Sequence, residues 1–195
     1  MTPAGRKERV DAVRNRETVL AAAARLLDAA DDPGEVSMGD IAAAAGVGKG
    51  TLFRGFGDRI GLLQALADQR GDRLRTQLAA GESSSDPVER ATATLDAILR
   101  FKLENRSLML ALENAGSGSP YRSSTYDRWH GHLAEIVAEV HGPDNADYLA
   151  HALLAVVRSD LIEHLSDQPP ARIRDGIAYL VRVLLSGDAP RRGTP

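Results

Sequence analysis

Residues 37–56, SMGDIAAAAGVGKGTLFRGF, decide how this chain folds. Ser37 is suited to cap a helix, and Asp40 follows three residues later, in the position of a capping box. Gly46 stands where the chain must reverse, because glycine adopts a positive φ without a Cβ clash. A second short helix is expected over about residues 48–54. Two short helices joined by a tight turn at this spacing predict a helix-turn-helix, whose second helix can enter the DNA major groove.

Longer helices are predicted on both sides of this segment. Apolar residues at the spacing of one helix face predict a helix over about residues 15–29. These residues are Val19, Ala22, Ala23, Leu26 and Leu27. An Asp-Asp-Pro-Gly turn at residues 31–34 ends that helix. On the other side, Asp58 is expected to cap a helix that continues to Leu74. The expected buried anchors of the segment between the two are Ile41, Val47 and Leu52.

Composition and charge exclude several classes of protein. The 195 residues include no Cys, which excludes a disulfide scaffold, a thiolate zinc site, an iron–sulfur cluster and a cysteine nucleophile. No apolar run approaches the roughly 20 residues of a bilayer span, and residues 1–17 lack the apolar stretch of a signal peptide, so we expect a cytoplasmic protein without membrane contact. The net charge of −3 argues weakly against a nucleic-acid partner. However, residues 1–75 hold 12 Lys+Arg and 11 Asp+Glu, whereas residues 76–195 hold 12 and 16.

The rest of the chain predicts more helices. A Ser-rich stretch at residues 81–86 separates it from the first unit. The last two predicted helices, 148–165 and 173–185, are apolar on more than one side, and the second side is most simply buried against another chain. Because no alternating strand pattern occurs, the predicted fold is all-α. Its predicted parts are a helix-turn-helix domain over 14–74, a helical domain over 86–186, and flexible tails at 1–13 and 187–195.

The region around the helix-turn-helix resembles the N-terminal domain of the TetR family of transcriptional regulators. The matching residues are Val19-Leu20-x-Ala22-Ala23-x-x-Leu26-Leu27, Ser37-x-x-Asp40-Ile41-Ala42, Ala45-Gly46-Val47-x-Lys49-Gly50-Thr51-Leu52-Phe53-x-x-Phe56 and Asp58-Arg59-x-x-Leu62-Leu63. The match runs from about Arg14 to Asp72, and the remainder is similar to the family's ligand-binding and dimerisation domain in its helical pattern alone.

This resemblance implies a function and its partners. It implies a DNA-binding regulator and not an enzyme, most simply a repressor that reads a palindromic operator and responds to an unknown small-molecule effector. The same resemblance implies a homodimer formed through the last two helices, with no cofactor. Such a dimer presents two basic arms and two recognition helices, so its DNA-facing surface can be positive while the total charge is negative.

The resemblance also implies which residues contact double-stranded DNA. The implied DNA-binding residues are Arg14, Ser37, Met38, Val47, Gly48, Lys49, Gly50, Thr51, Phe53, Arg54 and Arg59. Three of them depart from the family's usual residues, since Gly48 replaces Ser or Thr, Phe53 replaces Tyr, and Arg59 replaces Lys. Gly48 therefore lacks a hydroxyl cap, and Phe53 lacks a hydroxyl whose hydrogen bond is worth about 1 kcal/mol. Arg59 keeps the positive charge.

The same residues allow two other interpretations. Residues 46–51, GVGKGT, resemble a phosphate-binding loop, but Ala43 stands where that motif needs Gly, and the preceding residues favour a helix instead of a strand. The second alternative is a helical dimer that binds or converts a small molecule without any DNA function.

Candidates for an effector site lie in the second half of the chain. In this architecture the core of the second domain and the effector pocket often occupy the same space. The candidate residues are Phe101, Met109, Glu113, Trp129, His130 and His151. The spacing predicts no metal site, because His130 and His132 are two residues apart and point to different sides of a helix, and neither Cys nor an H-E-x-x-H motif is present.

Overall fold

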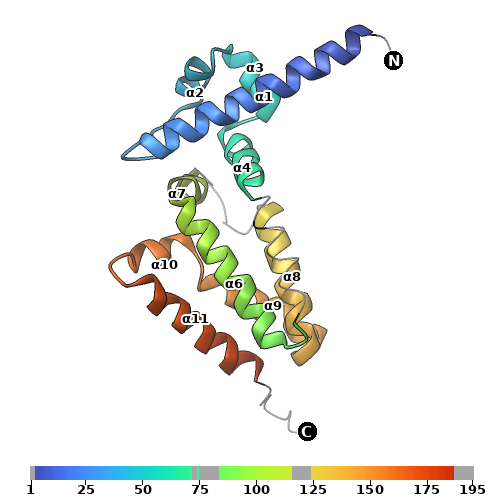
Figure 1. Ribbon diagram of the computed structural model, residues 1–195, viewed down its shortest axis with the longest axis vertical. Coiled ribbons are helices and arrows are strands. Elements are labelled where there is room, and N and C mark those ends of the chain that lie inside the picture. The colour runs from blue at the N-terminus through green and yellow to red at the C-terminus, as the bar shows by residue number, and fades with distance from the viewer. Residues whose placement is uncertain (1–2, 72–73, 75–83, 116–123, 187–195) are drawn as a thin grey trace. The chain divides into compact units, whose positions relative to one another are not determined.

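The computed structural model describes residues 3–71, 74, 84–115 and 124–186, and these residues form helices without any strand. The predicted all-α fold is therefore confirmed. The chain divides into two compact units, residues 1–70 with 105–120 and residues 71–104 with 121–195 (Figure 1). The helices of the first unit are α1 (Pro3–Ala29), α2 (Met38–Ala45), α3 (Lys49–Phe56), α4 (Arg59–Arg70) and α7 (Arg106–Ala115). The helices of the second unit are α6 (Pro87–Glu104), α8 (Ser124–His141), α9 (Pro143–Ala155), α10 (Ser159–His164) and α11 (Pro170–Leu185).

The first unit is built around α1, which packs against α2, α4 and α7. Its buried core includes Leu20, Ala23, Leu27, Ile41, Leu52, Leu62, Leu63 and Leu66. Helix α7 joins this core because it buries Leu108 and Ala111 while packing on α1 and α4. The division thus differs from the predicted one, which assigned all of residues 86–186 to a single second domain.

An ion pair holds α1, α4 and α7 together at one point. The Arg70 guanidinium on α4 donates to the Asp28 carboxylate on α1 at 2.8 Å and to the Asn105 side-chain oxygen, just before α7, at 3.1 Å. Arg70 is half-buried but the Asp28 side chain is 54% exposed, so solvent screens this pair and its net contribution to stability is small.

Helix α1 starts much earlier than the sequence predicted. The expected start was near residue 15 after a flexible tail at 1–13, but the helix begins at Pro3. Proline suits the first turn of a helix, and residues 6–14 contain neither Gly nor Pro to interrupt it. The predicted tail at 187–195 lies outside the described residues.

In the second unit, α6 packs against α8 and α11, and α8 packs against α9. The predicted helix over 148–165 is wrong, because the chain breaks between α9 and α10. Arg158 adopts an extended backbone there, with ψ at 142°, and its guanidinium donates to the Asp160 carboxylate at 2.7 Å. The β-branched pair Val156 and Val157 also favours a helix less than its neighbours do.

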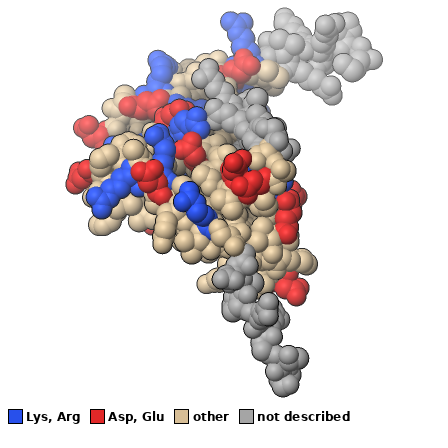
Figure 2. All heavy atoms as spheres, turned by 60° about the horizontal axis from the view of Figure 1, so that its bottom comes forward, with Lys and Arg blue, Asp and Glu red and all other residues tan. Residues whose placement is uncertain are grey.

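Surface charge is mixed on the face that Figure 2 shows. Lys and Arg lie among Asp and Glu on one side of that face, and Asp and Glu predominate on the other. This mixture is unlike the basic surface expected at a nucleic-acid interface. Among the described residues, no helix is both long enough and apolar enough to cross a membrane.

Candidate nucleic-acid interface

The turn between α2 and α3 has the geometry that its sequence predicts. The amide of Asp40 donates to the Ser37 hydroxyl at 3.2 Å, and the amide of Ser37 donates to the Asp40 carboxylate at 3.0 Å, so the capping box is complete. Gly46 ends α2 in the left-handed region, with φ at 67°, and the amide of Val47 donates to the Ala42 carbonyl at 3.0 Å. The predicted reversal at Gly46 is thereby confirmed.

Helix α3 has one buried side and one exposed side. Leu52 is 1% exposed and fixes α3 to the core, as predicted, whereas Phe53 beside it is 48% exposed. Lys49, Thr51 and Arg54 are also exposed. Of the other predicted anchors, Ile41 is buried and Val47 is only half-buried, because Val47 lies in the turn. The exposed side of α3 is therefore available to a ligand outside the protein.

The structure gathers all of the implied DNA-binding residues in the first unit. Arg14 lies exposed on α1, Ser37 and Met38 begin α2, and residues 47–54 form the turn and α3. Gly48 takes the N-cap position of α3 and, having no side chain, supplies no side-chain hydrogen bond there. The hydroxyl that Gly48 lacks would therefore have stood at the N-cap of α3, as the sequence predicted.

Arg16 contacts the end of α3, which the sequence did not predict. Arg16 on α1 donates to the Gly55 carbonyl at 3.3 Å, and its guanidinium carbon lies 4.6 Å from the centre of the Phe56 ring. A cation at this place also complements the negative end of the α3 dipole. Arg16 therefore links α1 to the last turn of α3.

Arg59 has a different surrounding from the one implied by the resemblance. Its Nε donates to the Val36 carbonyl at 3.0 Å, and its Nη2 donates to the Pro33 carbonyl at 2.7 Å. The half-buried guanidinium therefore links the start of α4 to the loop before α2. Side-chain bonds to loop carbonyls leave no periodic signal in a sequence, so only the structure could show them.

Two glycines allow close approach around α3. A Cβ at Gly61 on α4 would overlap the carbonyl oxygen of Phe56, so only glycine lets the end of α3 approach the start of α4 this closely. A Cβ at Gly39 on α2 would lie 3.2 Å from Cε of Lys49. The stem of Lys49 therefore lies across the first turn of α2.

The capping box predicts a pH-dependent stability. The hydroxyl of Ser37, followed by its backbone amide, lowers the pKa of Asp40 below its usual 3.8, and the charge of Lys49 adds to this effect. Because the folded-state pKa is the lower one, the stabilisation is present above pH 3.8 and is lost as the pH falls through the folded-state value. We expect Asp40→Asn to be less stable than the wild type at neutral pH, with the difference shrinking below pH 3.8.

Thermal unfolding followed across this pH range measures the difference. Ser37→Ala removes the hydroxyl that donates to the Asp40 carboxylate but keeps the amide of residue 37, so it should reproduce only part of the loss of pH dependence. A constant gap between Asp40→Asn and the wild type at all pH values would contradict the role of the carboxylate.

The predicted effector residues do not form one group. Phe101 and Trp129 meet edge to face in the second unit, with ring centres 6.2 Å apart, and the rings of His130 and His151 stack at 4.0 Å in the same unit. The other two candidates, Met109 and Glu113, lie on α7 and so belong to the first unit.

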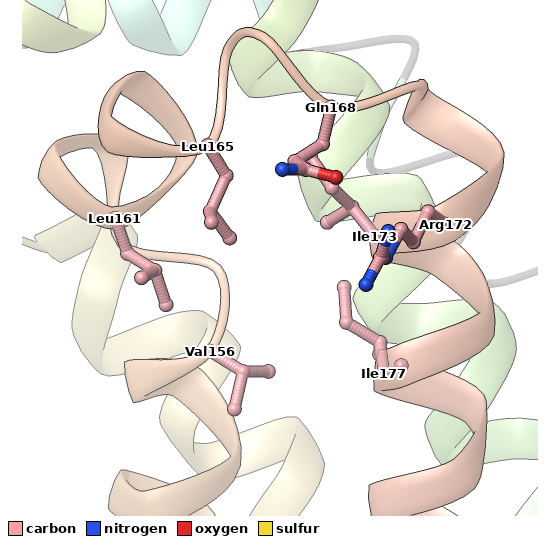
Figure 3. Close-up of a pocket in the computed structure, with 8 residues that line it drawn as sticks. Val156, Leu161, Leu165, Gln168, Arg172, Ile173 and Ile177 are labelled. Atoms are coloured by element: carbon pink, nitrogen blue, oxygen red, sulfur yellow. The ribbon is translucent and has the colours of Figure 1, made fainter.

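Two hollows open elsewhere in the second unit. A cleft of about 330 Å³ lies between α10 and α11, where Leu161 and Leu165 face Ile173 and Ile177 (Figure 3). A groove of about 520 Å³ runs between α6 and α11. In the described part of the chain, neither hollow is lined by any predicted effector residue.

Comparisons with known proteins match both units. A family model described as bacterial regulatory proteins, tetR family, matches residues 19–66. An HTH-type transcriptional regulator of Staphylococcus aureus is 28% identical over 160 residues, which are 80% of this chain and 84% of that protein. The HTH-type transcriptional repressor LfrR of Mycolicibacterium smegmatis is 41% identical over 78 residues, 40% of each chain.

Solved structures share the fold. A TetR-family regulator from Syntrophomonas wolfei has a TM-score of 0.64 at 17% identity and covers 92% of this chain and 98% of its own. The structure of LfrR in complex with proflavine has a TM-score of 0.55 at 24% identity and covers 90% of this chain and 97% of its own.

Proposed function

Since the chain belongs to the TetR family of bacterial regulatory proteins, we propose that it acts as a homodimeric repressor of a palindromic operator. Membership makes it a DNA-binding transcriptional regulator and not an enzyme, as its relatives are. The observation that carries the proposal is the exposed side of α3, which offers Lys49, Thr51 and Arg54 to solvent while Leu52 fixes the helix from behind.

In the proposed complex, α3 enters the major groove. Lys49, Arg54 and Arg14 contact phosphates, which supply most of the affinity and carry no sequence information. Thr51 and the backbone at Gly48 and Gly50 lie nearest the base edges. Few long polar side chains are available there, so contacts with thymine methyl groups and the shape of the DNA contribute to specificity.

The proposed dimer forms through the last helices of the second unit. Large apolar side chains are exposed on α9 and α11, with Tyr148 at 76%, Tyr179 at 67% and Val183 at 61%. The apolar cleft between α10 and α11 lies in the same region of the chain (Figure 3). A second copy would cover such surface, and its two-fold axis would place the two α3 helices on half-sites a whole number of DNA turns apart.

The proposed effector is a small molecule that binds the second unit. LfrR, which shares the fold, was solved in complex with proflavine. In this chain the buried edge-to-face pair of Phe101 and Trp129 offers an aromatic environment of its own. An effector that binds the DNA-free conformation more tightly shifts the population away from the operator.

A gel-shift experiment with the DNA upstream of the protein's own gene tests this function. Sequence-specific, salt-sensitive retention by a dimer supports it, and a monomer that retains no DNA at any salt concentration would overturn it. A dimer that retains no DNA would leave the alternative without a DNA function. Release of the DNA by a small molecule would then identify the effector class.

Lys49→Ala is expected to weaken operator binding. Losing one phosphate contact per protomer should reduce the slope of log K against log salt by about 0.9 per contact, so roughly twice that for the dimer. Fluorescence anisotropy at several salt concentrations measures both effects. Lys102→Ala is the control, measured without effector because its ammonium lies 5.8 Å from the centre of the Trp129 ring; it removes the same charge from the second unit and should leave both values unchanged. An unaltered slope in Lys49→Ala would show that α3 is not the DNA-contacting helix.

A further inference from the structure

Four polar side chains meet where α8 packs against α9, and neither the proposed DNA contacts nor the proposed dimer uses them. Tyr126 and His130 lie four residues apart on α8, and Asp147 and His151 lie four residues apart on α9. Each pair therefore occupies one face of its helix. One ligand atom from each of His130, Asp147 and His151 can be chosen so that all three lie within 4.8 Å of one another.

The two histidines are held close together. Their ring centres are 4.0 Å apart at an interplanar angle of 29°. Nε2 of His130 lies 3.5 Å from the Asp147 carboxylate and 3.1 Å from the Asp147 carbonyl oxygen. Both histidines are half-buried, whereas the Asp147 side chain is 79% exposed. The cluster is thus fixed on its inner side and open to solvent at its carboxylate.

Tyr126 orients the second histidine. Its hydroxyl lies 2.6 Å from Nδ1 of His151, and the two rings stack with centres 5.7 Å apart. When Nδ1–H donates to the Tyr126 oxygen, Nε2 is the ring nitrogen that carries the lone pair. Histidines that bind metals use this arrangement, in which the second ring nitrogen donates to a neighbouring oxygen.

We propose that His130, His151 and Asp147 bind a divalent transition-metal ion of the Zn²⁺ class, with Tyr126 as a positioning residue for His151. Two imidazole nitrogens and one carboxylate suit Zn²⁺, Co²⁺ or Ni²⁺ better than Mg²⁺ or Ca²⁺, which prefer oxygen ligands. Three protein ligands leave the fourth tetrahedral position to water.

The geometry is close to what the ion needs. Ligand bonds of about 2.0–2.2 Å bring tetrahedral ligand atoms roughly 3.4 Å apart, so atoms up to 4.8 Å apart must approach one another by as much as about 1.4 Å. The exposed Asp147 side chain can make that movement by rotation. The sequence predicted no metal because it compared His130 with His132 on one helix, and the pairing of His130 with His151 across two helices has no short spacing.

Calorimetric titration of the untagged, EDTA-treated full chain with Zn²⁺ tests the proposal. We expect one Zn²⁺ per chain and no binding of Mg²⁺ at the same concentrations. The visible absorption of bound Co²⁺ should show a low-symmetry site with nitrogen and oxygen ligands. A wild-type chain that binds no Zn²⁺ would overturn the proposal. Because the titration needs no DNA, its failure is distinguishable from failure of the repressor function.

Single substitutions test the assigned ligands. His130→Ala and His151→Ala should abolish stoichiometric binding, and Tyr126→Phe should weaken it by about 10- to 100-fold, as loss of an orienting partner does. His132→Ala is the matched control, since His132 lies on the same helix and contacts Thr94 instead, at 3.2 Å. The exposed Asp147→Asn variant keeps the test valid if a histidine variant unfolds, and it should weaken binding. Undiminished binding in Asp147→Asn and His130→Ala would place the metal elsewhere and overturn the proposal.

Discussion

Leu52→Ala is expected to lower the free energy of unfolding of the first unit by about 2–5 kcal/mol, whereas Phe53→Ala should change it by less than about 1 kcal/mol. Leu52 is 1% exposed and fills the core beneath α3, so its truncation leaves a cavity. Phe53, the next residue, is 48% exposed and has less packing to lose. The adjacent pair therefore separates the folding side of α3 from its binding side.

Phe53→Ala should affect DNA binding more than it affects stability. Phe53→Ala removes a large side chain from the exposed side of α3, so we expect weaker operator binding by a fully folded protein. Far-UV circular dichroism suits the unfolding measurement, because the single Trp, Trp129, lies in the second unit and does not report on the first. Equal stability losses in both variants would contradict the assignment of the two sides.

Gly61→Ala is expected to destabilise the first unit by roughly 1–3 kcal/mol. The added Cβ would overlap the carbonyl oxygen of Phe56, which is backbone and cannot rotate away, so α3 and α4 must separate. The higher helix propensity of alanine returns at most about 1 kcal/mol. The same displacement should weaken operator binding, because Phe56 ends the helix that carries the proposed contacts.

Gly55→Ala is the matched control for this change. Gly55 lies inside α3, and a Cβ there would meet nothing within 4 Å among the described residues. Alanine should therefore stabilise the helix by about 0.5–1 kcal/mol. Chemical denaturation of both variants measures the contrast. A Gly61→Ala protein as stable as Gly55→Ala would show that the approach of α3 to α4 is not tight.

The sequence predicted the parts of the fold that depend on residues adjacent in the chain. The capping box at Ser37 and the left-handed turn at Gly46 each depend on a few consecutive residues, and the structure has both. The start of α1 was missed because no apolar periodicity begins at Pro3, and the break at Arg158 was missed because the lower helix propensity of Val156 and Val157 is a weak signal beside the apolar pattern that continues across it. Periodicity could show that α7 is amphipathic, but it could not show which unit its apolar face would join.

In the candidate site, too, the sequence predicted the features that depend on consecutive residues and missed those that join distant ones. Residues 47–54 could be predicted because they are consecutive in the chain and together form one turn and one short helix. The bonds of Arg16 and Arg59 to carbonyls, the close approach at Gly61, and the meeting of His130 with His151 all join residues far apart in the sequence. Each depends on how helices pack, and one sequence contains no direct record of that packing.

The glycines of α3 bear on how readily the protein could acquire a new DNA sequence preference. Added Cβ atoms at Gly48, Gly50 and Gly55 would meet nothing within 4 Å among the described residues, and the backbone at Gly48 has an ordinary φ of −69°. Larger side chains can therefore be introduced on this helix while Leu52 continues to hold it in place. Evolution or an engineer could change what the regulator recognises without first having to restabilise its fold.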